Sequence, residues 1–139
     1  MAEAQAKKTI AFELVAAERA FPSEPAMMVV VPGAEGDMGV LAGHAPVLST
    51  LRPGVVTVHL PAGEVKKIFV SGGFVDISAA VCSVLAEEVI NVDEIDRARA
   101  EEKLKSLEAE LAAAKDDPVR AAGLEKRIAV NRARIAAAG

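Results

Sequence analysis

The residues of this chain that could do chemistry are few, and His44 is the first to consider. It follows Gly43 and precedes Ala45-Pro46. A zinc or iron site needs three or four converging ligands, and the chain has neither an HExxH nor a CxxC pattern. A catalytic triad needs a nucleophile on a sharp exposed turn, and the segment GDMGVLAGHAP has no serine. We therefore predict no metal site and no catalytic residue, and we expect His44 to bond locally and shape a turn.

A second candidate is the segment IDRARA, residues 95–100. Asp96 and Arg99 are three residues apart and share a face if this segment is helical. The simplest interpretation is an acid near a helix start that pairs with a following base. The other interpretation is a pocket for an anion or nucleotide, completed by arginines further along the chain. Those arginines are Arg127, Arg132 and Arg134, and the pattern alone leaves both interpretations open.

Composition excludes several classes of function. The net charge is −4, and the chain has no Trp, no Tyr and only four Phe. Nucleic-acid binding requires a basic surface and usually aromatic stacking platforms, so we expect no nucleic-acid partner. The single cysteine, Cys82, lies in an apolar run, which predicts a buried and inert thiol. No apolar stretch reaches the roughly 18–20 residues that span a bilayer, so we expect a soluble protein of a reducing compartment.

The chain divides into two parts near residue 90. Residues 1–90 contain eight of the ten glycines and six of the seven prolines, whereas residues 91–139 are rich in Ala, Glu, Arg, Lys and Leu. Glycine and proline punctuate short strands, and the second set favours helix. By direct count, residues 1–90 carry 6 bases and 10 acids, and residues 91–139 carry 10 of each. We predict a β domain over 1–90 and a helical region over 91–139.

The first part shows short β-type runs between turn residues. They cover residues 9–17, 26–32, 55–60, 65–70, 73–79 and 81–89, and Ala62-Gly63 lies between two of them as a hairpin loop. Runs at this spacing, with no helical pattern between them, favour an antiparallel sandwich or barrel.

The second part has a helical period. One apolar stripe is formed by Ala100, Leu104, Leu107 and Leu111. Asp93, Glu94 and Asp96 are expected in the first turn of this helix, where acids complement the free N–H groups. Asp117 can cap a second helix that has Pro118 at its first position. The second stripe is formed by Ala121, Leu124, Ile128, Asn131 and Ile135, and a short connection makes the two helices antiparallel neighbours.

Three segments taken together resemble the epsilon subunit of F-type rotary ATP synthase, which corresponds to mitochondrial delta. The segments are GDMGVLAGHAPVLSTLRPG, FVSGGFVDIS and IDRARAEEKLKSLEAEL. The resemblance implies a flattened sandwich of about ten strands followed by an antiparallel two-helix hairpin. It identifies the chain as a non-catalytic rotor subunit of a proton-translocating synthase, peripheral to the cytoplasmic side of the inner membrane.

The resemblance also implies partners and contact residues. The sandwich would bind the gamma subunit and the polar loops of the c-ring through a contact set of Asp37, Gly39, His44 and Pro46, with Asp37 and His44 at the c-ring. The hairpin would either fold onto the sandwich or extend toward the alpha/beta catalytic hexamer, where it obstructs ATP hydrolysis. Thin apolar stripes are consistent with two docked states of similar free energy.

Some members of the resembled family bind ATP at the hairpin through a motif that Ile95, Asp96, Arg99 and Ala100 match. The resemblance therefore implies a nucleotide site with second-helix arginines such as Arg127 and Arg132. No other cofactor is expected. Two alternatives to the rotor subunit remain at this point: a stand-alone nucleotide sensor that uses Asp96 and Arg99, and a small β-sandwich enzyme, against which the lack of a complete acid, base and nucleophile set argues.

Overall fold

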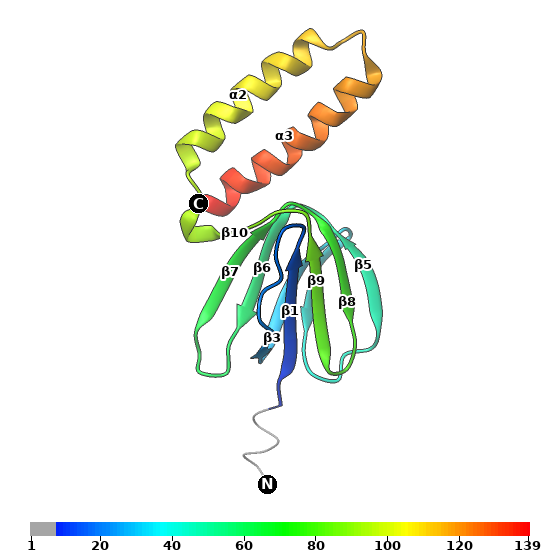
Figure 1. The fold of residues 1–139 in the computed structure, drawn as a ribbon, viewed down its shortest axis with the longest axis vertical. Coiled ribbons are helices and arrows are strands. Elements are labelled where there is room, and N and C mark those ends of the chain that lie inside the picture. The colour runs from blue at the N-terminus through cyan, green and yellow to red at the C-terminus, as the bar shows by residue number, and fades with distance from the viewer. Residues whose placement is uncertain (1–7) are drawn as a thin grey trace.

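The computed structural model describes residues 8–139, and it consists of a ten-stranded sheet followed by two packed helices (Figure 1). This confirms the predicted fold class. The strands are β1 (Ile10–Ala16), β2 (Glu24–Ala26), β3 (Met28–Gly33), β4 (Gly36–Val40), β5 (Val47–Leu51), β6 (Gly54–His59), β7 (Val65–Val70), β8 (Gly73–Ile77), β9 (Val81–Ala86) and β10 (Val89–Asn91).

The sheet curls into a sandwich with the strand order β10-β7-β6-β3-β5-β8-β9-β1-β2, and β4 pairs with β3 outside this path. The predicted turn at Ala62-Gly63 joins β6 to β7, with the Gly63 N–H donating to the Leu60 carbonyl. The expected antiparallel pairing holds for every pair of these strands except one, since β1 pairs with β9 in parallel. Neither strand follows the other in sequence, so a tight hairpin does not fix their relative direction.

Alternation along the strands builds the sandwich core. Ile10, Phe12 and Leu14 of β1 point inward, while Ala11 and Glu13 between them do not. The inner residues are mostly Val and Ile, whose branched side chains suit a pleated surface. The core consists of Ile10, Phe12, Leu14, Ala26, Val29, Val31, Val40, Leu51, Val56, Val58, Ile68, Val70, Val75, Ile77, Cys82, Val84 and Ala86.

The helices α2 (Arg97–Ala113) and α3 (Pro118–Ala138) form a hairpin at one end of the sandwich (Figure 1). Asp117 caps α3 and Pro118 is its first residue, as the sequence predicts. Asp93 and Glu94 do not lie in the first turn of α2, because a separate 3₁₀ turn, η1 (Val92–Glu94), precedes it. Asp96 is the N-cap, and its side chain accepts a hydrogen bond from the Arg99 N–H.

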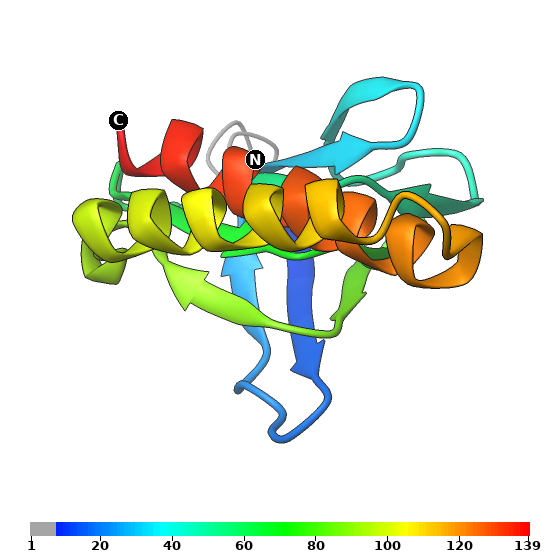
Figure 2. The ribbon, with the colours of Figure 1, turned by 90° about the horizontal axis from the view of Figure 1, so that it is seen from above.

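The hairpin has its own small core, separate from that of the sandwich. It consists of Leu107, Ala114, Leu124 and Ile128, with Leu104 and Leu111 partly buried against it. Seen from above, the two helices run side by side across the end of the sandwich, and in the side view α3 is the nearer of the two to the strands (Figures 1 and 2). The predicted stripes therefore face each other, and α3 also rests on the sandwich.

Candidate functional sites

Asp37 lies on β4 and is held by Arg52. The Arg52 Nη2 donates to the Asp37 Oδ1 at 2.5 Å, and Nη1 donates to the carbonyl oxygen of Gly33 at 2.5 Å. One guanidinium therefore joins the β3–β4 turn to the segment that follows β5. Gly39 lies further along β4, opposite Val30. The Asp37 carboxylate remains more than half exposed, so it can meet a partner while Arg52 fixes its position.

His44 lies in the loop between β4 and β5, and its contacts are local. Its Nδ1 is 2.7 Å from the carbonyl oxygen of Ala45, and its backbone N–H donates to the carbonyl of Leu41. Because a carbonyl oxygen only accepts, Nδ1 carries the proton and Nε2 is left facing away from that bond. Pro46 ends the loop immediately before β5. This agrees with the expectation of a histidine that shapes a turn.

The structure does not bring Asp37 and His44 together. Strand β5 pairs with β8 so that Val47 faces Ile77 at one end and Leu51 faces Gly73 at the other. Gly43, the neighbour of His44, donates to the carbonyl of Ala79 just beyond the Ile77 end, whereas Arg52 with Asp37 follows the Leu51 end. The predicted contact set Asp37, Gly39, His44 and Pro46 thus does not form a single cluster, because Asp37 and His44 lie near opposite ends of β5.

Sequence reasoning missed a row of exposed apolar side chains on the outer face of four neighbouring strands. Phe74 lies directly opposite Leu85, and Leu85 lies opposite Val15. Leu48 is two residues from Thr50, which faces Phe74 on the next strand. Leu48 is 74% exposed and Phe74 54%. We call Val15, Leu48, Phe74 and Leu85 the apolar row. Its signal in the sequence was strand alternation, since buried Val75 and Ile77 force Phe74 outward.

A cavity of about 870 Å³ lies where α2 begins, between the hairpin and the sandwich. Ile95, Asp96, Arg99 and Ala100 of the predicted nucleotide segment all line it. The carboxylate of Asp96 is used for capping α2, and Arg97 pairs with Glu101 one turn later. The remaining walls include basic side chains from both helices and one from the sandwich, together with several carboxylates. The basic residues are Arg19, Arg99, Lys103 and Arg134.

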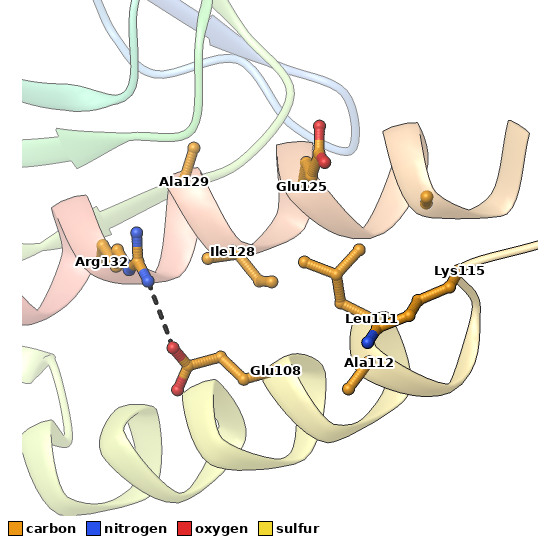
Figure 3. Close-up of a pocket in the computed structure, with 9 residues that line it drawn as sticks. Glu108, Leu111, Ala112, Lys115, Glu125, Ile128, Ala129 and Arg132 are labelled. Atoms are coloured by element: carbon orange, nitrogen blue, oxygen red, sulfur yellow. Dashed lines mark hydrogen bonds and ion pairs between the residues drawn. The ribbon is translucent and has the colours of Figure 1, made fainter. Parts of the chain in front are cut away.

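Arg127 and Arg132 do not share that cavity. Arg132 lies on the outer groove between the helices and pairs with Glu108 at 3.2 Å, as the dashed line in Figure 3 marks. Arg127 lines a different cavity, of about 640 Å³, between α3 and the loops around Pro53 and Gly72. Of the second-helix arginines that the sequence singled out, Arg134 is the one that the structure brings beside Asp96 and Arg99.

The last features to consider are the single cysteine, possible metal sites and possible membrane-spanning helices. Cys82 is buried in the sandwich core, and burial raises the pKa of its thiol to about 12, since the charged thiolate is disfavoured there. Residues 8–139 contain no cluster of His, Cys, Asp and Glu side chains that could hold a metal ion. Within the same residues, no helix combines the length and the apolar character that crossing a membrane requires.

Comparison with known proteins connects this geometry to one group. The family described as ATP synthase, Delta/Epsilon chain, beta-sandwich domain matches residues 9–92. The ATP synthase epsilon chain of Mesorhizobium japonicum is 47% identical over 109 residues, which cover 78% of this chain and 81% of that protein. The epsilon chain of Rhodospirillum centenum is 40% identical over 129 residues, covering 89% and 88% respectively.

Two solved structures with the same fold come from mitochondrial complexes. A chain in the cryo-EM structure of the Euglena gracilis mitochondrial ATP synthase, OSCP/F1/c-ring, superposes with a TM-score of 0.84 at 25% identity, over 95% of this chain and 82% of that one. A chain of the Tetrahymena thermophila mitochondrial ATP synthase has a TM-score of 0.55 at 17% identity, over 64% and 71%, and shares the fold.

Proposed function

This chain belongs to the epsilon-chain family of F-type ATP synthase, as a non-catalytic central-stalk subunit, and from that premise we propose how it is held in the rotor. The sandwich binds the gamma subunit through the apolar row and the His44 loop. It meets the c-ring through the Asp37–Arg52 pair. The whole chain then lies on the cytoplasmic side of the inner membrane, attached through these partners.

The observation that carries this proposal is the exposure of the apolar row. A group of large apolar side chains on one sheet face, with Asp76 directly opposite Leu48 and Glu13 two residues from Val15 on the same face, is a typical protein-binding surface. Each such side chain contributes about 1.5–3 kcal/mol when fully buried. A rotor subunit carries torque, so a broad contact on a stiff sheet suits it better than a single flexible helix.

The two ends of the predicted contact set differ in chemistry. The Asp37 end presents an ion pair, which suits polar loops such as those of a c-ring. The His44 end presents exposed Leu41 beside His44 and Pro46, which suits a more apolar protein surface. We therefore assign Asp37 and Gly39 to the c-ring contact, and His44 and Pro46 to the gamma contact.

Binding to gamma tests the first assignment. Phe74→Asp places a charge in the middle of the apolar row and should weaken capture of gamma by at least about 30-fold, as loss of a central contact residue does. Val65→Asp is the matched control, because Val65 is also an exposed strand residue but lies on β7, outside the row. Equal capture by the two variants would contradict the gamma assignment.

Coupling measurements separate the two ends. In membranes, Asp37→Ala should lower proton-driven ATP synthesis while gamma stays bound, because only the c-ring contact is lost. His44→Ala should instead weaken capture of gamma. If both single variants lose gamma equally, the division of the contact set is wrong.

The helical hairpin supports a regulatory role, in which it leaves the sandwich and obstructs ATP hydrolysis by the alpha/beta hexamer. Its core is small and separate from that of the sandwich, so it can move without unfolding the strands. A complex in which the chain ends at residue 94 should hydrolyse ATP faster than the complex with the full chain. An unchanged rate would remove the inhibitory role and leave the docking role intact.

A second candidate function is nucleotide sensing at the cavity beside Asp96. The observation that favours it is that Arg99 and Lys103 line one cavity, since these cations suit a phosphate chain; Arg134 lines it too but is paired with Glu88. Calorimetry with ATP on the full chain should give binding that Arg99→Ala abolishes and Arg127→Ala does not, because Arg127 lies in another cavity. Absence of heat with the unmodified chain would end this candidate.

A further inference from the structure

Phe69 is an aromatic side chain in an unexpected position. Its neighbours on β7, Ile68 and Val70, belong to the sandwich core, so alternation points Phe69 to the outside of the sheet. An outward side chain is ordinarily exposed, yet Phe69 is 0% exposed and belongs to neither apolar core. Its flanking partners on the sheet are Val55 and Ile90. Something outside the sheet must complete its cover.

Arg134 of α3 contributes to that cover, and the 3₁₀ turn η1 also contacts β7. The Cζ atom of Arg134 lies 5.5 Å from the centroid of the Phe69 ring, within the range of a cation–π contact. The same guanidinium donates from Nη2 to the Oε2 of Glu88 at 2.9 Å. Although it is a long surface-type side chain, Arg134 is only 27% exposed. One residue of the hairpin therefore contacts an aromatic ring and a carboxylate of the sandwich at once.

Few other polar contacts hold the hairpin on the sandwich. Among residues 8–139, Arg134–Glu88 is the single ion pair that joins the hairpin to the sandwich, through the turn between β9 and β10, since Arg132–Glu108 and Arg97–Glu101 both lie within the hairpin. Cavities of about 640 and 870 Å³ lie at this junction, and Arg134 lines both of them. Open space therefore lies on both sides of Arg134, and the other main contacts of α3 outside the hairpin are its packing on β6 and η1.

We propose that Phe69, Glu88 and Arg134 form a latch that sets how much of the time the hairpin is docked on the sandwich. Breaking the latch frees α3 and uncovers an aromatic ring, and high salt favours the broken state because the ion pair is partly exposed. This regulates the hairpin role proposed above, but docking in the isolated chain does not depend on whether the hairpin inhibits hydrolysis. Its test is therefore independent of the synthase.

Distances between two spin labels measure the docked fraction directly. The labels are attached to cysteines at exposed positions, Glu64→Cys on the sandwich and Val119→Cys at the far end of the hairpin. Cys82 stays unlabelled because it is buried. Arg134→Gln removes both the charge and the cation–π contact. It should raise the ratio of undocked to docked molecules by about tenfold, because the effects of losing one modest ion pair and one modest cation–π contact multiply.

Arg132→Gln is the matched control. Arg132 is on the same helix, two residues away, and makes the same kind of pair with Glu108, but within the hairpin. It should leave the label distances unchanged. Glu88→Gln should raise the undocked ratio by a smaller factor than Arg134→Gln, because the ring contact survives, and the double variant should match Arg134→Gln alone.

Phe69→Leu isolates the aromatic part of the latch. The substitution keeps an apolar side chain, so the strand is expected to fold, which circular dichroism checks. In the Phe69→Leu background, Arg134→Gln should have a smaller effect than in the unmodified chain. The latch is overturned if Arg134→Gln gives the same distances as Arg132→Gln, or if its effect is unchanged when Phe69 is leucine.

Discussion

The side-chain amide of Asn131 on α3 donates a hydrogen bond of 2.5 Å from Nδ2 to the carbonyl oxygen of Ala100 on α2. Asn131 is 3% exposed, and it is the one buried polar side chain in the described part of the chain. The bond joins the second half of α3 to the first turn of α2. It therefore fixes how far the two helices are shifted along each other, a role that apolar stripes alone do not perform.

Asn131→Ala tests this role. The substitution removes the inter-helix bond and leaves a small void, so we expect the hairpin to lose about 1–3 kcal/mol of stability. Urea unfolding followed by the helical signal in circular dichroism measures the change. The exposed Asn91→Ala is the control and should change stability by less than about 0.5 kcal/mol. A similar loss of stability in both variants would show that the buried hydrogen bond contributes no more than an exposed side chain.

Replacing glycine by alanine should have opposite effects on stability at Gly73 and at Gly123. Gly73 has φ of +142°, and a Cβ there would collide with the carbonyl oxygen of Leu85, so Gly73→Ala should cost more than about 3 kcal/mol or prevent folding. Gly123 lies inside α3 with nothing within 4 Å of an added Cβ. Gly123→Ala should therefore stabilise the helix by up to about 1 kcal/mol. Urea midpoints of the two variants check both signs, and a stable Gly73→Ala protein would contradict the collision.

Because the Cys82 thiol is buried, we expect the folded state to lose stability at alkaline pH. Burial raises the pKa of its thiol from 9.0 to about 12, so above pH 9 the unfolded chain releases the thiol proton and the folded chain keeps it. The folded state is then disfavoured by about 1.4 kcal/mol for each pH unit up to the folded pKa. The stability difference between the unmodified chain and Cys82→Ala should change by this slope above pH 9 and be constant below it. A difference that stays flat to pH 11 would refute the shift.

A strand of this fold can be predicted from the sequence only where the local order of residues is typical of a strand. Six of the ten strands were expected close to their observed positions, because β1, β3, β6, β7, β8 and β9 are rich in Val and Ile and are bounded by turn residues. Strand β4 was not, since Gly36, Asp37 and Gly39 have low strand preference and β4 exists only because it pairs with β3. Strands β2 and β10 have three residues each, too few for a pattern.

The candidate sites show the same division. The sequence predicts the capping of α3 by Asp117, because capping depends on neighbours in the sequence, whereas it places Asp96 in the first turn of α2 and the structure makes it the N-cap. The sequence does not predict that Asp37 lies apart from His44. Nor does it predict that Arg134, and not Arg127 or Arg132, lies beside Asp96. These depend on how distant segments pack, and a single sequence carries no direct record of such contacts.

The two separate apolar cores predict that the hairpin unfolds before the sandwich. Ile128→Ala deletes one of the four buried residues of the hairpin core and should cost the hairpin about 2–4 kcal/mol. The helical signal in circular dichroism should then melt at lower urea concentration than in the unmodified chain. The Cys82 thiol reports the sandwich independently, because it reacts with a thiol reagent only when the sandwich core opens. Its urea midpoint should stay unchanged in Ile128→Ala and fall in Val84→Ala, which removes a core residue of β9. If Ile128→Ala shifts both midpoints together, the two cores unfold as one unit, and a hairpin that leaves the sandwich intact is excluded.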